Sequence, residues 1–284
     1  MRALVFAHFD PHDIVDDYVV FALKCYRSHF DMIIFSTVCR LSNKETEKAG
    51  RYSDLIICRS NVGYDFMSWK FGFDALRQEE FKTVTFANDS CYGPLSDVGL
   101  LIGASSASSD ALWGAAVNHQ FSRHVQSFYM TFKEPLLRTG FASQFWSRVG
   151  VKDAKEDIIF SYEIGLSQSV LQAGLTIGGL VEFDNPSDEV IKRVVHDNLN
   201  AGEIHTDARG YIENERFPNP MQLYWGEAMR RKLPFVKIEL LRDNPLRANL
   251  RNLMHVVESH PHYDAHLIYN HLRRVRPHAC LFKQ

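Results

Sequence analysis

The stretch FKTVTFANDSCYGPL, residues 81–95, decides the fold class of this chain. Polar and apolar residues alternate from Thr83 to Phe86 in the pattern of a β-strand. The pattern stops at Asn88-Asp89-Ser90, and Gly93-Pro94 then turns the chain. A carboxylate and two short polar side chains therefore follow the carboxyl end of a strand, where open α/β sheets bind their ligands. Asn, Asp and Ser also favour ordinary turns, so both interpretations of the triplet stay open on this stretch alone.

Short apolar runs and helical patterns alternate through the first half of the chain. Strands are predicted at residues 3–8, 32–37, 55–59 and 83–87, with helices at 15–27 and 66–76. Strands separated by helices build a parallel sheet from right-handed βαβ units. We therefore expect an α/β fold with a Rossmann-type, mostly parallel sheet flanked by helices.

The second half predicts two further strands and then mainly helices. We expect strands at 112–117 and 125–132, helices at 140–149, 159–173, 221–231, 246–259 and 264–274, and irregular loops at 103–110 and 198–219. No repeat or low-complexity tract divides the chain. The simplest partition is one domain over residues 1–245 and a C-terminal helical extension over 246–284 that packs on the same domain.

Composition excludes several classes of protein. A formal net charge of -2 over 284 residues provides no basic field for nucleic acid. The five cysteines are scattered, which favours reduced thiols in the cytoplasm over disulfides or a zinc site. No apolar run reaches the roughly 18 residues that span a bilayer, and His8 and Asp10 interrupt the N-terminal apolar run too early for a signal peptide. The basic segment HLRRVRPH (271–278) fits either a solvated helix end or contact with anionic lipid headgroups.

Polar clusters follow the first and third predicted strands. His8 and Asp10 come directly after the first strand, at the edge where such a sheet binds ligands. After the third strand, Arg59 precedes Asn61-Val62-Gly63, a turn whose backbone amides can approach a phosphate or ribose closely. Arg59 adds a cation of the kind suited to a diphosphate. An ordinary turn explains the second cluster as well, so both interpretations remain.

A glutamate, Glu163, lies near a predicted helix start further along the chain. Partial burial would raise its pKa toward a value that suits a general base, whereas a glutamate at a helix start is also ordinary capping chemistry. The order of the clusters favours function. An Asn-x-Gly turn, a strand that ends in an Asp-containing triplet, and a later Glu form the layout of a nucleotide-sugar transferase of the GT-A type.

Six segments along the chain carry a more specific resemblance: HFDPHDIVDDYV (8–19), RSNVGYDFMSWKFG (59–72), FANDSCYGPL (86–95), HVQSFYMTF (124–132), YEIGLSQ (162–168) and NPMQLYWGEAMRRKLPFVKIELLRDNP (219–245). In sequence and order they resemble the rhamnan synthesis F proteins of bacterial polysaccharide assembly, over at least residues 3–245. The resemblance implies an inverting, GT-A-like glycosyltransferase. Its reaction would move a rhamnose, another deoxy sugar or a furanose from a nucleotide diphosphate onto a growing lipid-linked glycan.

The resemblance also implies roles for individual residues. Asp89 becomes the main ligand of a divalent cation, Mg²⁺ or Mn²⁺, although Asn88 and Ser90 stand where a full Asp-x-Asp motif has carboxylates. Glu163 becomes the catalytic base, with Asp65 in reserve. The implied donor-binding residues are His8, Asp10, Arg59, Asn61, Gly63, Lys70, Asn88, Ser90 and Arg242. The implied acceptor-binding residues are Tyr92, His124 and Trp225, although a tryptophan in a helical pattern is more typical of a core.

The expected partners follow from the same resemblance. They are a dTDP-, UDP- or GDP-linked sugar and a lipid-linked glycan acceptor, with peripheral contact to the inner membrane or to other assembly enzymes left open. A non-catalytic nucleotide-sugar- or glycan-binding subunit of an assembly complex is the alternative. It is favoured by the reduced Asp89 motif and by Met221-Gln222, where the family tends to have Thr-His. A dehydrogenase is disfavoured because no Gly-x-Gly-x-x-Gly follows the first strand.

Overall fold

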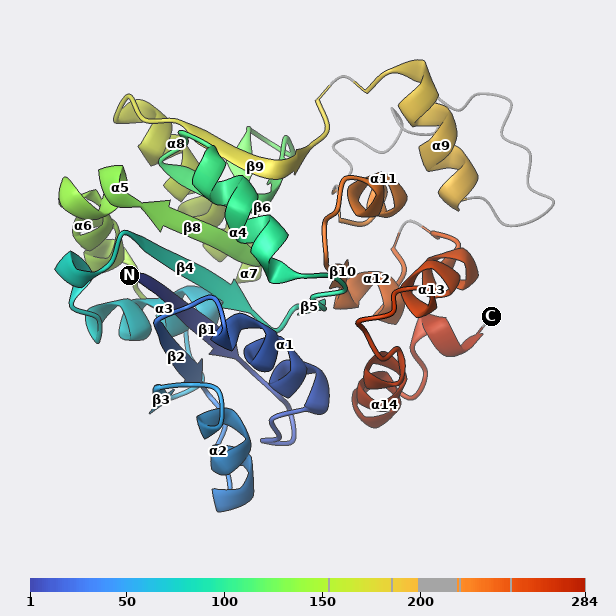
Figure 1. Cartoon of the computed structure of the whole chain (residues 1–284), viewed down its shortest axis with the longest axis horizontal. Helices are drawn as coiled ribbons and strands as arrows, with labels where there is room; N and C mark the ends of the chain where they lie inside the picture. The colour runs from blue at the N-terminus through green and yellow to red at the C-terminus, as the bar shows by residue number, and fades with distance from the viewer. Residues whose placement is uncertain (153, 185, 199–218, 220, 246, 284) are drawn as a thin grey trace.

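The computed structural model describes residues 1–152, 154–184, 186–198, 219, 221–245 and 247–283 (Figure 1). Within them, eight strands form one sheet in the order β3-β2-β1-β4-β8-β6-β7, with β9 paired to β6. The strands are β1 (Arg2–His8), β2 (Met32–Thr37), β3 (Leu55–Cys58), β4 (Thr83–Asn88), β6 (Leu112–Asn118), β7 (His124–Val125), β8 (Tyr129–Lys133) and β9 (Ile177–Glu182). A separate two-stranded sheet joins β5 (Cys91–Tyr92) to β10 (Val236–Lys237).

The sheet is mixed and mostly parallel. β3 pairs with β2, β2 with β1, β1 with β4, and β6 with β9, all in parallel. β8 lies antiparallel between β4 and β6, and β7 is antiparallel to β6. The parallel register aligns His8 with Thr37 and Ala7 with Asn88, so β1, β2 and β4 end at one edge of the sheet.

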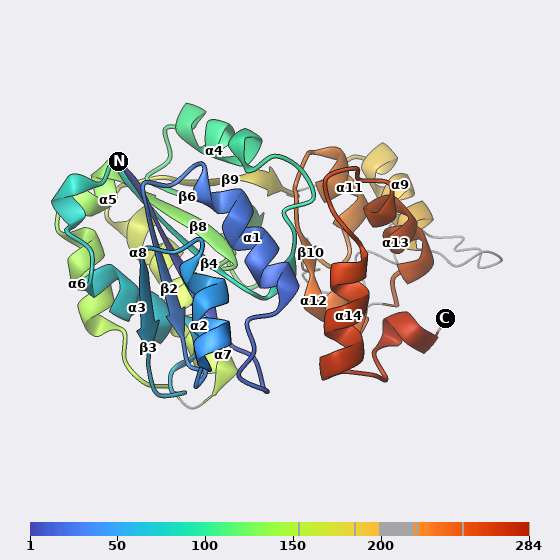
Figure 2. The same cartoon turned by 60° about the horizontal axis from the view of Figure 1, so that its bottom comes forward.

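Helices cover both faces of the sheet (Figure 2). In chain order they are α1 (Asp17–Arg27), α2 (Asn43–Gly50), α3 (Tyr64–Asp74), α4 (Val98–Ala107), α5 (Glu134–Arg138), α6 (Phe141–Arg148), α7 (Lys155–Ile158), α8 (Gly165–Gln172), α9 (Asp188–Asn198), α11 (Trp225–Arg230), α12 (Ile238–Arg242), α13 (Leu250–Glu258) and α14 (His266–Val275). Short 3-10 turns lie at Gln78–Glu80 and Cys280–Lys283. A π-helical segment, Ile159–Ile164, joins α7 to α8, and the Gly165 N–H donates to the Phe160 carbonyl five residues back.

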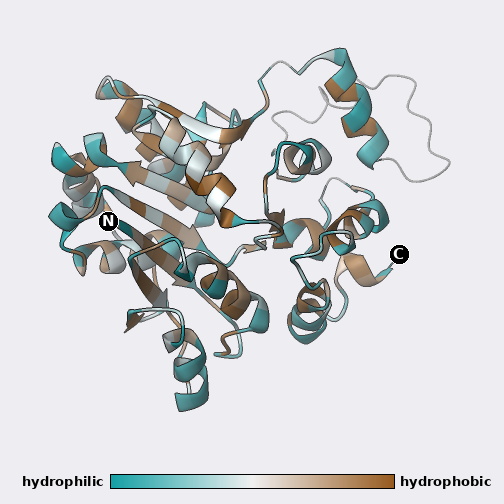
Figure 3. Ribbon diagram, in the orientation of Figure 1, coloured by the Kyte–Doolittle hydropathy of each residue, from teal (hydrophilic) through white to brown (hydrophobic). Residues whose placement is uncertain are grey.

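Each face of the sheet carries its own hydrophobic cluster. Along β1, Leu4 and Phe6 belong to the cluster shared with α1 and α4, while Val5 and Ala7 belong to the cluster shared with α3, α6 and α8. Successive side chains of a strand point to opposite faces, which divides the clusters in this way. The central strands β1 and β2 are accordingly largely hydrophobic in Figure 3, whereas α2, at the edge beyond β3, is hydrophilic.

The predicted α/β class, with a mostly parallel sheet flanked by helices, is confirmed. The loop predicted at 103–110 is wrong, because residues 98–107 form α4. Asp97 caps this helix by accepting a hydrogen bond from the Gly99 N–H at 2.8 Å, and Val98 and Leu101 are buried. Capping and burial outweigh the poor helix propensity of its glycines and serines.

Other differences lie in both halves of the chain. The strand predicted at 125–132 is divided into β7 and β8 by a turn at residues 126–128. The helix α2 and the strand β9 had no counterpart among the predicted elements. The irregular loop predicted at 198–219 lies almost wholly outside the described residues.

The C-terminal helices α11 to α14 gather on the side of the molecule toward which β1 and β4 point (Figures 1 and 2). They share the hydrophobic cluster of α1: Leu253 of α13 and Ile268 and Leu272 of α14 are fully buried in it. The ring of Phe21 in α1 packs edge-on against Tyr263, with centroids 5.2 Å apart. The division at residue 245 stays a prediction. No helix of the described residues combines the length and the apolar character needed to cross a membrane.

Two helical glycines provide a test of how closely α3 packs on the sheet. A Cβ atom at Gly72 in α3 would lie 2.2 Å from Val5 Cγ1, whereas one at Gly103 in α4 would meet nothing within 4 Å. We expect Gly72→Ala to lower the free energy of unfolding by about 1–3 kcal/mol through overpacking. Gly103→Ala should leave it unchanged or raise it by up to about 1 kcal/mol through helix propensity. Urea denaturation of both variants measures the difference, and equal effects would refute close packing of α3 on β1.

Candidate functional site

Three adjoining cavities lie along the carboxyl edge of the sheet. The Arg59 cavity, of about 630 Å³, lies over the ends of β1, β2 and β3. The Glu163 cavity, of about 460 Å³, lies beyond β4 toward β7 and the π-helical segment. The α14 cavity, of about 540 Å³, is bordered by residues of α12 and α14. Lys155 borders all three cavities, Asp65 borders the first two, and Asp89 borders the Arg59 and α14 cavities. The cavities therefore adjoin one another, and together they are called the cleft.

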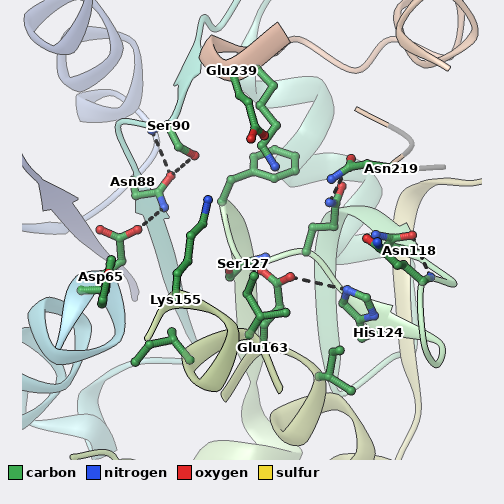
Figure 4. Close-up of a pocket in the computed structure, with 18 of the residues that line it drawn as sticks. Asp65, Asn88, Ser90, Asn118, His124, Ser127, Lys155, Glu163, Asn219 and Glu239 are labelled. Atoms are coloured by element: carbon green, nitrogen blue, oxygen red, sulfur yellow. Dashed lines mark hydrogen bonds and ion pairs between the residues drawn. The ribbon is translucent and has the colours of Figure 1, made fainter. Parts of the chain in front are cut away.

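The Asn88-Asp89-Ser90 triplet is held in the cleft by its own hydrogen bonds. The Asp89 carboxylate accepts the Phe9 N–H at 2.7 Å, and the Asp89 carbonyl accepts the Tyr18 hydroxyl at 3.0 Å. Asn88 Nδ2 donates to the Asp65 carboxylate at 2.8 Å, and Asn88 Oδ1 accepts the Ser90 hydroxyl at 2.6 Å (Figure 4). The triplet thus joins the end of β4 to the β1–α1 loop and to the first turn of α3.

The carboxyl groups of Asp65 and Asp89 share a low-dielectric environment. Burial raises the pKa of Asp65 above its ordinary value, although Asn88 donates to it. Burial also raises the pKa of Asp89 well above its ordinary value, and the nearby charge of Asp65 adds to the effect. Neither carboxylate forms an ion pair with a basic side chain of the described residues. A cation brought by a ligand would therefore be stabilised here.

A preformed metal site is not present among the described residues, since no group of three or more His, Cys, Asp and Glu side chains is placed to hold an ion. The pair Asp65 and Asp89 is nevertheless compatible with Mg²⁺, which usually binds one or two carboxylates and takes further ligands from substrate phosphates and water. The donor set therefore fits an ion whose site is completed by the substrate.

Arg59 organises the loop that closes its cavity. Its guanidinium donates to the carbonyls of Ser60, Val62 and Tyr64, and to the Ser68 hydroxyl. Gly63 adopts φ 75°, in the left-handed region that favours glycine, and a Cβ atom there would lie 2.3 Å from Met67 Cγ. The Arg59 side chain therefore fixes the turn, and its contact with a diphosphate stays a prediction. Asn61 and Gly63 do border the cavity.

Glu163 is held by two neighbours from the β7–β8 region. One carboxylate oxygen accepts both the N–H of Ser127, at 2.9 Å, and its hydroxyl. The other lies 3.5 Å from His124 Nε2, and His124 Nδ1 lies 2.7 Å from the Ser122 carbonyl (Figure 4). Burial raises the pKa of Glu163, but the hydrogen bonds from His124 and Ser127 outweigh burial and leave the pKa below its ordinary value. The expectation of a raised pKa is wrong, and the carboxylate is ionised at neutral pH.

Several predicted contact residues lie in the protein interior. The Tyr92 and Trp225 side chains are buried, and their polar atoms bond His271 and Asn198. Asp10 is also buried and is paired with Arg274. Lys70 borders none of the three cavities and donates to the Val149 carbonyl at 2.8 Å. The first three side chains are engaged in structural contacts of the interior and Lys70 is half-exposed; the ligand contacts of all four stay predictions.

The remaining predicted residues lie on the cleft. His8 borders the Arg59 cavity, but its Nδ1 lies 2.9 Å from the Thr37 hydroxyl and its ring is buried. Arg242 borders two cavities and pairs with Asp243 at 2.6 Å. The structure thus brings Asp65, Asn88, Ser90, His124 and Glu163 to one cavity, and Asp89 beside it.

Lys155 is the main residue that sequence reasoning missed. Its amino group points into the cleft between Asp65 and Glu163 (Figure 4), and it makes no hydrogen bond or ion pair with the described residues. No motif marks it in the sequence. The amide-rich wall of the Glu163 cavity was missed for the same reason; it comprises Asn118, Gln120, Gln126, Asn219 and Gln222. The Gln126 side-chain oxygen is buried without a hydrogen-bond partner in the described chain.

The environment of His8 predicts how stability depends on pH. Burial lowers the pKa of His8 from 6.5 to about 4, so the unfolded chain binds a proton that the folded protein excludes. The folded state therefore has its full stability with respect to His8 above about pH 6.5, and it loses stability as the pH falls toward 4. We expect the free energy of unfolding to decrease by about 2 kcal/mol between pH 7.5 and 5 on account of His8. Burial likewise lowers the pKa of His271 to about 4, which adds a loss of the same sign.

Chemical denaturation at several pH values measures this dependence. His8→Gln should make the slope below pH 6.5 shallower, whereas His266→Gln, at an exposed position of α14, should leave it unchanged. If the free energy of unfolding of His8→Gln keeps the wild-type dependence on pH, a group other than His8 is responsible for that dependence.

Comparison with known proteins places the chain among sequence relatives. Over 199 residues it is 28% identical to the virulence protein VirA of Vibrio anguillarum, covering 68% of this chain and 64% of that protein. It is 26% identical over 179 residues to the uncharacterised protein y4gN of Sinorhizobium fredii, covering 60% of this chain and 46% of that one. The chain thus spans less than two thirds of the length of either relative.

A solved structure with a similar arrangement is 4-diphosphocytidyl-2C-methyl-D-erythritol synthase from Anaerococcus prevotii. The TM-score is 0.42 at 12% identity, over 65% of this chain and 89% of that one. The family assignment therefore rests on sequence. The model of the family described as rhamnan synthesis protein F matches residues 33–200, more than half of the chain, and the chain belongs to this family.

Proposed function

We propose that this chain is a glycosyltransferase that moves a sugar from a nucleotide diphosphate donor to a hydroxyl group of a growing bacterial surface polysaccharide. The observation that carries the proposal is that the Arg59 and Glu163 cavities adjoin at Asp65 and Lys155. Asp65 borders both the Arg59 cavity and the Glu163 cavity, so a donor in the first could present its sugar to an acceptor in the second. Membership of the rhamnan synthesis F family supports the same class of reaction.

The donor is assigned to the Arg59 cavity. Its volume of about 630 Å³ lies in the range of small-molecule sites, and a dTDP-, UDP- or GDP-linked sugar would place its diphosphate toward Asp89. Asp89, with Asp65 beside it, would hold Mg²⁺ or Mn²⁺, which when bound neutralises charge on the diphosphate. Lys155 and Arg242 border the same cavity and add positive charge from the chain itself.

Glu163 is the proposed base. The oxygen of the acceptor hydroxyl attacks the anomeric carbon from the face opposite the nucleotide and forms the new glycosidic bond. The bond from that carbon to the diphosphate breaks, its electron pair leaves with the nucleoside diphosphate, and the hydroxyl proton passes to Glu163. Inversion follows from this single displacement. Asp65 is the reserve candidate, since burial raises its pKa toward a more basic range.

The acceptor is assigned to the Glu163 cavity. Amide side chains such as Asn118 and Gln222 line it, and such groups can donate and accept hydrogen bonds with sugar hydroxyls. Exposed Phe121 at the rim packs against Phe160, with ring centroids 4.9 Å apart, and offers an aromatic face to a sugar ring. A lipid-linked glycan and peripheral contact with a membrane belong to this proposal.

A non-catalytic nucleotide-sugar-binding subunit is the second candidate. It is favoured by the single carboxylate of the Asn88-Asp89-Ser90 triplet and by the two hydrogen bonds that already occupy one Glu163 oxygen. Such a subunit would bind the donor without ever releasing nucleoside diphosphate.

The role of Glu163 is tested by an isosteric substitution. Glu163→Gln should reduce nucleoside diphosphate release from the donor about 100-fold or more, because the general base is lost. Calorimetric titration should find donor binding unchanged. Glu239→Gln changes another carboxylate of the same cavity, one that accepts from Gln222 at 2.8 Å, and is the matched control. Normal turnover in Glu163→Gln would show that Glu163 is not the base. A loss of nucleoside diphosphate release in Asp65→Asn would then identify Asp65 as the base.

The metal assignment is tested by thermal shift. UDP, dTDP and GDP and their sugar conjugates should raise the melting temperature of the wild-type protein, and Mn²⁺ should increase the rise, because a ligand that binds only the folded state stabilises it. Asp89→Ala should remove the increment due to Mn²⁺. If the increment persists in Asp89→Ala, the ion is bound elsewhere. If no nucleotide stabilises the wild type, the donor assignment fails.

A further inference from the structure

The last turns of α14 lie against the loop between β1 and α1. Arg274, in this helix, lies 264 residues from Asp10, yet its guanidinium contacts both Asp10 oxygens. The same guanidinium donates to the Asp16 carboxylate at 2.9 and 3.1 Å, and lies 3.0 Å from His12 Nδ1. All three of its nitrogen atoms are therefore used in holding this one loop.

Asp10 passes this constraint to the backbone of the loop. One Asp10 oxygen accepts the N–H groups of His12, at 2.8 Å, and Ile14, at 3.3 Å. The side chain is 4% exposed, so its charge depends on Arg274 for compensation. Phe9, the residue before Asp10, donates its N–H to Asp89 Oδ2 at 2.7 Å. The loop shape that Arg274 fixes is thus the shape that aims the Phe9 N–H at Asp89.

A second contact from α14 supports Asp89 from its other side. His271, one turn before Arg274, packs on the Tyr18 ring with centroids 4.6 Å apart, and its Nδ1 lies 2.6 Å from the Tyr92 hydroxyl. The Tyr18 hydroxyl donates to the Asp89 carbonyl at 3.0 Å. Both the side chain and the backbone of Asp89 are therefore supported by groups that α14 holds in place.

We propose that Arg274 is a positioning residue that fixes the Asp89 carboxylate in the place where it would hold the divalent cation of the donor diphosphate, acting through Asp10 and the Phe9 backbone. The inference rests on the proposed function, because that function supplies the cation and the diphosphate. Under this proposal α14, which lies beyond the residues matched by the family model, contributes to the donor site.

Two measurements on the full chain test the proposal. Hydrogen exchange of the Phe9 amide reports the contact to Asp89 without any ligand. Calorimetric titration in the presence of Mn²⁺ measures the dissociation constant of whichever of UDP, dTDP and GDP binds the wild type most tightly. Arg274→Gln should speed exchange at Phe9 and weaken nucleotide binding about 10- to 100-fold, as loss of a supporting residue usually does. Arg274→Lys keeps the positive charge but loses the planar guanidinium that donates to both carboxylates, so its exchange rate and affinity should lie between those of the wild type and Arg274→Gln. It replaces Arg274→Gln in both measurements if that variant fails to fold.

The neighbouring Arg273 provides the matched control. Its guanidinium lies over the rings of Tyr269 and Phe282, away from the β1–α1 loop. Arg273→Gln makes the same change in charge on the same helix and should leave both measurements at their wild-type values. Wild-type exchange at Phe9 in the Arg274 variants, or wild-type nucleotide affinity, would overturn the positioning role. Failure of the wild type to bind any nucleoside diphosphate would instead refute the proposed donor, while Phe9 exchange would still decide whether Arg274 positions Asp89.

Discussion

The parallel pairing of β1 with β2 on one side and β4 on the other is the constraint on which the cleft depends. Parallel strands end at the same edge, so the residues after β1, β3 and β4 are brought together although they are far apart in the sequence. The hydrogen bond from the Phe9 N–H to Asp89 is a direct result, since each residue follows the end of its own strand. The antiparallel strand β8 then begins beside the end of β4, and the turn before β8 places Ser127 against Glu163.

Buried charge is distributed unevenly along this edge. Asp10 has a guanidinium partner, Glu163 has His124 and Ser127, and their pKa values lie below the ordinary range. Asp65 and Asp89 lack a basic partner of this kind among the described residues, and burial raises their pKa values. Asp10 and Glu163 thus have partners within the chain, whereas Asp65 and Asp89 border the cleft without an ion-pair partner among the described residues. Perturbed carboxyl groups in a cleft are typical of functional sites.

The parts of the fold that could be predicted are those set by local pattern. The bounds of β1, β2 and β4 were predicted within one or two residues, because β1 and β2 are short apolar runs and β4 alternates polar and apolar residues before its polar end. The helix α4 was missed because its stability depends on burial against the sheet, which single-sequence propensity does not contain. The candidate site followed the same division. Asp89 and Glu163 lie on the cleft as expected. The lowered pKa of Glu163, however, depends on partners that are distant in the sequence, and the burial of Asp10 depends on its ion pair with Arg274.

The π-helical segment before α8 influences the direction in which the Glu163 side chain points. A π-helical turn accommodates one residue more than an α-helical turn, and such turns are frequent at functional sites. Glu163 lies inside this wider turn, between α7, which begins with Lys155, and α8. Deleting one residue from this segment and restoring regular winding would leave α7 and α8 in nearly the same relative rotation, because the wider turn absorbs the extra residue. The residues inside the segment would change direction instead, so the direction of the Glu163 side chain is set by residue count as much as by residue identity.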